Sequence, residues 1–334
     1  MCLRSIFRGD QYYLLMPHEL TDSKSIGSKW SDWPFIVIAG GILIWATQPW
    51  QVLQAKDALL LSVSVLLVFF LLWWTDQYER EPLRTIAWAF LWGAFPAALI
   101  SIALQYAWPT LFGAVIIEEL AKLIALIVIF RRGSIQSWSD GLVMGGFIGL
   151  GFAAFEDVIY AINGNDAFAT LISRGIFSIF AHTFFSGLGA TIIVFGLLTK
   201  RKWLSFLGFS AAVFLHLTWN TILAFEIFSY ASAGFFFFYS FLPPIVLFVV
   251  AILLRKQERH ELLNKGYVAI QSGYLDEIRL SQIVSFRERR SFYRSFGTKE
   301  EKSVARAGLY DDTRNLLSGA YTSPRIVDET DFTY

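Results

Sequence analysis

The residues best suited to chemistry are ionisable and polar side chains that stand inside long apolar stretches of the sequence. They occur in four such stretches, and two of the chain's four histidines are among them. A charge at the centre of a bilayer costs about 2.5 to 3.5 kcal/mol on insertion scales, so each of these residues needs a partner or a function. The set comprises Glu118, Glu119, Lys122, Glu156, Asp157, His182, His216 and Asn220.

Spacing along the chain predicts that these side chains meet at similar depths in the membrane. If the four stretches are helices that rise 1.5 Å per residue, Glu118 lies roughly 13 Å below the outer surface and Glu156 roughly 10 Å below it. On the same assumption His182 and His216 each lie roughly 18 Å below that surface. Four helices that bring polar groups to similar levels predict one water-accessible cavity.

Helical periodicity also predicts which of these residues interact. Lys122 follows Glu118 by four residues and Glu119 by three, so it can neutralise one carboxylate while the other faces the cavity. His216 and Asn220 are four residues apart and therefore share one helix face.

This combination of residues suits the hydrolysis of a peptide bond, which needs an activated water, a proton donor and stabilisation of the oxyanion. In one version Glu118 or Glu119 is the general base, and His216 and Asn220 donate to the oxyanion. In the other, His182, His216 and one carboxylate, for which Glu156 is the candidate, bind Zn²⁺ with water as the fourth ligand. The sequence leaves both open, because it contains no HExxH motif to favour a metal.

The main alternative to an enzyme is a proton-coupled membrane transporter, because buried Glu and His residues also form proton relays. Transporters often consist of repeated halves with broken helices, and the sequence shows no such repeat. A membrane scaffold without catalysis would leave the buried charges unexplained. We therefore favour hydrolysis.

The elements that position these residues are predicted to be membrane-spanning helices. Of the 334 residues 55% are apolar and 16% charged, whereas soluble proteins carry about 25% charged residues. Eight stretches are apolar over the length that a span of about 20 residues requires. We expect an all-α, polytopic protein of about eight spans, at 33–50, 58–75, 83–107, 109–130, 141–163, 170–198, 203–228 and 234–254.

The chain is expected to comprise a cytoplasmic N-terminal segment (1–32), a membrane domain (33–254) and a small cytoplasmic tail (255–334). Lys and Arg concentrate in alternate loops, which by the positive-inside rule places both termini in the cytoplasm of a multi-pass cell-membrane protein. The tail should be helical at 275–294 and loose at 311–334. Arg174, near the outer end of the sixth span, is expected to extend to the membrane surface and to take no part in chemistry.

Other compositional features exclude some partners and sites. The formal net charge of +1 gives no reason to expect a nucleic-acid partner. A single cysteine, Cys2, excludes an intramolecular disulfide and a cysteine metal site.

Several separated motifs carry a resemblance to a known family. They are DQYEREP at 76–82 followed by LWG at 91–93, EELAK at 118–122, DGLVMG at 140–145 with FAAFE at 152–156, His182, and HLTWN at 216–220. In this order and spacing the sequence resembles the PrsW family of intramembrane proteases, relatives of the CAAX prenyl endopeptidases. One departure is Asp157, where the family usually has Asn. The resemblance implies a single-span, membrane-anchored protein substrate, typically an anti-sigma factor cut near its extracytoplasmic side.

Overall fold

The computed structural model describes residues 54–78, 80–175, 177–224 and 230–322, and within these ranges the regular elements are all helical. The expected N-terminal segment and the first expected span, 33–50, lie outside the described residues. The chain divides into two compact units. One lies within Lys29–Gln257 and is called the membrane unit; the other contains Glu258–Tyr334 and is called the C-terminal unit.

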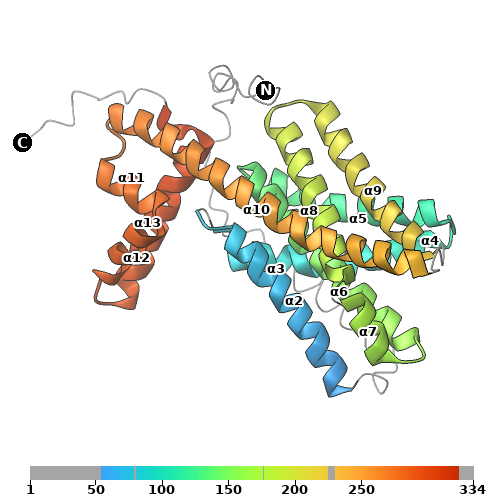
Figure 1. Ribbon diagram of the computed structural model, residues 1–334. Helices are drawn as coiled ribbons and strands as arrows, with labels where there is room; N and C mark the ends of the chain where they lie inside the picture. The colour runs from blue at the N-terminus through green and yellow to red at the C-terminus, as the bar shows by residue number, and fades with distance from the viewer. Residues whose placement is uncertain (1–53, 79, 176, 225–229, 323–334) are drawn as a thin grey trace, which may run out of the picture. The chain divides into compact units, whose positions relative to one another are not determined.

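The membrane unit is a set of helices connected mostly by short turns, which Figure 1 colours from blue (α2) to yellow (α9). Its last helix, α10 (Tyr230–Gln271), continues into the C-terminal unit. The preceding elements are α2 (Ala55–Thr75), α3 (Leu83–Trp92), the π-helical turn η5 (Gly93–Ala97), α4 (Ala98–Gln105), α5 (Leu111–Arg131), α6 (Trp138–Asn163), α7 (Ala167–Gly175), α8 (Phe177–Leu198) and α9 (Lys202–Ala224).

Among the described residues, four helical segments are long and apolar enough to cross a membrane: Ala55–Thr75, Leu83–Gln105, Trp138–Asn163 and Ala167–Leu198. They coincide with four of the eight expected spans. The helix α5 is 21 residues long but carries Glu118, Glu119 and Lys122 near its middle. The remaining spans, and the cytoplasmic position of the termini, stay predictions.

Helix α6 forms the centre of the membrane unit, because it packs against α2, α3, η5 and α8 and is buried over most of its length. Glycines make this close packing possible. A Cβ atom added at Gly149 would lie 2.4 Å from the carbonyl oxygen of His182, and one added at Gly151 would lie 1.9 Å from that of Phe90. The backbones of α8 and α3 therefore lie directly against α6, and this fixes the heights of Glu156 and His182.

Local sequence signals define where these helices begin. Ser137 and Asp140 form a capping box at the start of α6, and the Thr110 hydroxyl accepts a hydrogen bond from the Gly113 N–H (3.0 Å) at the start of α5. Pro82 is the N-cap of α3, and the buried Asp76 carboxylate just before it accepts the Glu81 N–H at 2.8 Å. Burial raises the pKa of Asp76 well above its usual value, against the opposing effect of the Glu81 N–H, and the neighbouring Asp140 carboxylate raises it further.

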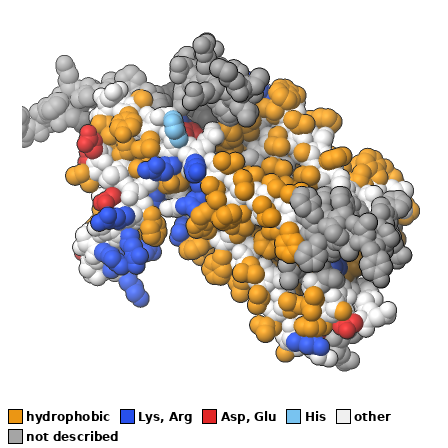
Figure 2. Space-filling view, viewed as in Figure 1, with side chains coloured by type: hydrophobic (Ala, Val, Ile, Leu, Met, Phe, Trp, Pro, Cys, Tyr) orange, Lys and Arg blue, Asp and Glu red, His pale blue; other side chains and the backbone are white. Residues whose placement is uncertain are grey.

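The C-terminal unit contains the end of α10, α11 (Glu277–Val284), α12 (Phe286–Arg294), α13 (Lys299–Ser318) and the 3₁₀ turn η6 (Ala320–Thr322). Helices α11 and α12 occupy the stretch expected to be helical. The stretch expected to be loose from residue 311 is instead helical as far as Ser318, because α13 begins at a Thr298 capping box and buries Leu316 and Leu317. Figure 2 shows that Lys and Arg side chains gather on this unit, whereas the helices of the membrane unit present mainly hydrophobic side chains.

Candidate active site

Glu119 of α5, one of the expected site residues, is buried and makes two polar contacts through a single oxygen. One of its oxygens, Oε1, accepts from Lys122 Nζ at 2.8 Å and lies 2.8 Å from Nδ1 of His216 on α9. The spacing of the sequence allowed Lys122 to neutralise either carboxylate, and in the structure it pairs with Glu119. This carboxylate therefore holds a lysine and a histidine in place.

Glu118, the other carboxylate, has an oxygen that is still available. Its Oε1 accepts a hydrogen bond from Nε2 of Gln105 at 3.0 Å. Its buried Oε2 lies 3.5 Å from His216 Nε2 and has no hydrogen-bond partner among the described residues. An exposed fraction of only 6% means that bulk water does not compensate this oxygen. Glu118 therefore has a buried oxygen that can accept a proton or bind a ligand.

The proton positions on His216 follow from its neighbours. Because the Glu119 carboxylate can only accept, Nδ1 of His216 carries the proton and donates it to Glu119. Nε2 then keeps its lone pair, and the side-chain amide nitrogen of Asn220 lies 3.3 Å from it. In this tautomer the His216 atom that faces Glu118 is an acceptor, and its role as an oxyanion donor stays a prediction.

His182, on α8, has the opposite arrangement. Its Nδ1 lies 3.3 Å from Lys122 Nζ, and an ammonium group can only donate, so Nδ1 accepts. The proton is then on Nε2, which faces Glu156 Oε2 at a distance of 3.0 Å. The rings of His182 and His216 are 4.6 Å apart, centre to centre. The site thus contains one imidazole that accepts and one that donates.

Arg174 of α7, which was expected to take no part in chemistry, contacts this cluster. Its guanidinium lies 3.0 Å from Glu156 Oε2 and 3.2 Å from Asp157 Oδ1, and it stacks on Tyr160 with a separation of 3.7 Å. Arg174 therefore pairs with two carboxylates from neighbouring positions of α6. The presence of Asp157, where the family usually has Asn, fits this contact, because an Asp supplies a second counter-charge for Arg174.

A metal ion could be held by part of this cluster. One ligand atom from each of Glu118, His182 and His216 lies within 4.8 Å of the other two. Two imidazoles and one carboxylate are a typical ligand set for catalytic zinc, and the unpaired Glu118 Oε2 is the kind of atom that a metal would satisfy. Glu156, the carboxylate expected from the sequence, is not in this group and pairs with His182 and Arg174.

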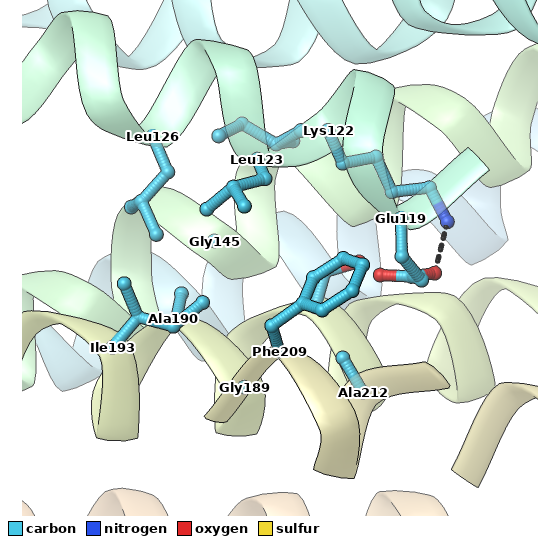
Figure 3. A pocket seen from close by; sticks show the side chains of 12 residues that line it. Glu119, Lys122, Leu123, Leu126, Gly145, Gly189, Ala190, Ile193, Phe209 and Ala212 are labelled. Atoms are coloured by element: carbon cyan, nitrogen blue, oxygen red, sulfur yellow. Dashed lines mark hydrogen bonds and ion pairs between the residues drawn. The ribbon is translucent and has the colours of Figure 1, made fainter. Parts of the chain in front are cut away.

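A small cavity adjoins Glu119. Figure 3 shows the hydrogen-bonded Glu119 and Lys122 of α5 beside this cavity, with α8 and α9 on its other side. Its volume of about 30 Å³ is enough for one water molecule. Ser186 also lines it, with a buried hydroxyl that has no hydrogen-bond partner in the described part of the chain. Glu119, Lys122 and Ser186 together offer the polar contacts that such a water requires.

Comparison with known proteins identifies the family of the chain. A family profile described as "PrsW family intramembrane metalloprotease" matches residues 81–254, more than half of the chain. The chain belongs to the PrsW family. It is accordingly a membrane protein and a peptidase.

Two relatives in this family are each named "Protease PrsW". The one from Geobacillus kaustophilus is 27% identical over 178 residues, which cover 48% of this chain and 76% of the relative. The one from Clostridioides difficile is 27% identical over 188 residues, which cover 50% of this chain and 79% of the relative. No solved structure matches the chain.

The PrsW match includes all of the candidate site residues, and also two residues to which the sequence reasoning gave no part in the site. Gln105 stands alone near the end of an apolar stretch, and its only signal was a carboxamide at the depth of Glu118. Arg174 lies near the end of another apolar stretch, where the sequence predicts a side chain that extends to the membrane surface. In this PrsW protein both residues hold carboxylates of the cluster, Gln105 from α4 and Arg174 from α7.

Proposed function

We propose that this protein hydrolyses a peptide bond of a single-span, membrane-anchored protein near its extracytoplasmic side, with Glu118 as the general base. The observation that carries the proposal is the buried Oε2 of Glu118, which has no hydrogen-bond partner among the described residues and lies 3.5 Å from the acceptor nitrogen of His216. A water molecule that donates a hydrogen to Glu118 Oε2 would keep its lone pairs free to attack a carbonyl carbon.

The residues around Glu118 supply the remaining steps. Glu118 takes a proton from the attacking water and returns it to the amine nitrogen as the peptide bond breaks. The side-chain amide of Asn220, which lies 3.3 Å from His216 Nε2, has a second N–H that suits the oxyanion. Glu119 and Lys122 keep the two imidazoles in the required tautomers.

A second version of the mechanism includes a metal, and the close approach of Glu118, His182 and His216 favours it. These three residues would hold a zinc ion, which when bound polarises the carbonyl and lowers the pKa of a bound water. Glu119 would orient His216 through Nδ1, as carboxylates commonly do for metal-bound histidines. His182 would have to free one ring nitrogen from its present neighbour, which is Lys122 at Nδ1 and Glu156 at Nε2. Both versions require Glu118.

The experiment is cleavage of a panel of single-span membrane proteins by the purified full-length protein, with new chain ends identified by mass spectrometry. We expect Glu118→Gln to lower the rate roughly 100-fold or more, since loss of a general base typically costs this much. Glu300→Gln, on the exposed surface of α13, is the matched control and should cleave at the wild-type rate. Near wild-type cleavage by a folded Glu118→Gln protein would refute the assignment, and no cleavage by the wild type would count against the proposed substrate class.

A further inference from the structure

A second and larger hollow lies where α4 turns into α5. Its volume is about 460 Å³, within the range of roughly 300 to 1,000 Å³ that is usual for ligand sites. We call it the turn hollow. Its lining residues are Ile102, Gln105, Tyr106, Trp108, Pro109, Thr110, Leu111 and Ala114.

The turn hollow is connected to the candidate active site through one side chain. Gln105 lines the hollow and also donates a hydrogen bond to Glu118 Oε1 at 3.0 Å. A molecule in contact with Gln105 is therefore one residue away from the proposed base. The opposite oxygen of Glu118 faces His216, so the hollow and the imidazoles lie on two sides of the same carboxylate.

The chemistry of the lining defines what the hollow can bind. No lining residue is charged, and the Thr110 hydroxyl already caps α5 by accepting from Gly113. Two aromatic rings and three aliphatic side chains make most of the surface, which excludes a charged or strongly polar ligand. A carboxamide has a second N–H and a carbonyl oxygen beyond the donor given to Glu118, and these match a peptide backbone.

We propose that the turn hollow binds the uncharged segment of the substrate next to the bond that is cut, in extended form, with Gln105 as the polar contact to its backbone. A backbone that leaves its helix to be cut must find new hydrogen-bond partners wherever water is scarce. Gln105 supplies them beside Glu118, and Tyr106, Trp108 and Leu111 accommodate apolar side chains. This inference rests on the proposed function, since the occupant is the substrate of that reaction.

Cysteine cross-linking tests the position of the substrate directly. The chain has one cysteine, so Cys2→Ser gives a background without thiols. Tyr106→Cys, at a side chain that is 85% exposed, is then combined with Glu118→Gln so that the substrate binds but is not cut. The partners are single-cysteine versions, scanned around the cleavage site, of a protein that the wild type cleaves. We expect cross-linking several times above control at positions adjacent to the cut bond.

The control is Leu67→Cys on α2, an apolar side chain that is 60% exposed and lies outside the hollow, which measures random collision in the membrane. Leu111→Cys provides a second site in the hollow in case the tyrosine itself is required. Cross-links at both hollow positions no stronger than at Leu67→Cys, with a wild type that cleaves, would overturn the hollow and leave the proposed function intact. Absence of cleavage by the wild type would instead overturn both.

A substrate variant gives an independent readout. Lysine placed at the residue that cross-links most strongly to Tyr106→Cys should raise KM at least several-fold with little change in kcat, because the hollow has no counter-charge. An unchanged KM would contradict binding of this segment in the turn hollow.

Discussion

Replacing Arg174 by Gln should destabilise the membrane unit, because this one side chain neutralises two neighbouring carboxylates. Asp157 is fully buried (0% exposed), and the Arg174 and Glu156 side chains are each 20% exposed. Removal of the guanidinium leaves both acids without this cation, and Glu156 Oε2 keeps the His182 ring as a neighbour, with Nε2 at 3.0 Å. Glutamine can donate to one of the two acids but carries no charge.

The expected size follows from this burial. Removing one partner of a fully buried ion pair costs about 3 to 5 kcal/mol. Because water reaches a fifth of the Arg174 side chain, we expect about 2 kcal/mol of unfolding free energy, or a fall of roughly 4 to 8 °C in melting temperature. Tryptophan fluorescence of the full-length protein in detergent, followed during heating, measures the shift.

Two further variants make the reasoning refutable. Arg84→Gln changes an exposed arginine and should melt within about 1 °C of the wild type. The double change Arg174→Gln with Asp157→Asn removes one of the stranded acids and should recover about half of the loss, since contacting residues are not additive. If Arg174→Gln melts like Arg84→Gln, or if the double variant is less stable than the single one, the two-carboxylate interpretation is wrong.

Two other predictions concern metal and pH. If the metal version holds, elemental analysis of active protein should give about one equivalent of zinc that His216→Ala loses, and strong chelators should abolish cleavage; full activity with less than about a tenth of an equivalent would leave the glutamate mechanism. The second concerns Asp76, whose pKa burial raises in the folded protein. The folded state then holds this proton more tightly than the unfolded state, whose carboxyl titrates near pH 4, so stability should fall as pH rises above about 4. Asp76→Asn should lack this part of the fall in urea titrations, and parallel stability curves for the two proteins would refute it.

The sequence predicted which residues form the site better than it predicted which of them contact one another. Glu118, Glu119 and Lys122 lie on one helix, so their relative positions followed from helical periodicity. His182 and His216 could be brought to a common depth because each span rises by a constant amount per residue. These features need no knowledge of how neighbouring helices rotate about their own axes.

The contacts that the sequence could not predict all depend on such rotation or on packing. Arg174 reaches Glu156 because α7 packs beside α6, which no pattern in a nine-residue helix reveals. Helical spacing allows Lys122 to pair with Glu118 or Glu119, and only the structure shows that it pairs with Glu119, which also contacts His216 of α9. In the tail, a polar composition concealed the few buried leucines that keep α13 helical beyond residue 311.

The helix face on which Gln105 lies depends on the number of residues in the π-helical turn η5. Each residue of a helix rotates the chain by about 100°, so a wide turn that accommodates one extra residue turns everything after it to a new face. Gln105 follows η5 along the continuous segment Leu83–Gln105 and meets Glu118 with that rotation included. Substitutions within 93–97 that keep the length would preserve this face. Deletion of a single residue there would restore regular α-helical geometry and move the Gln105 carboxamide away from Glu118. In an alignment, a one-residue gap at this turn would therefore distinguish relatives that lack this contact from relatives that have it.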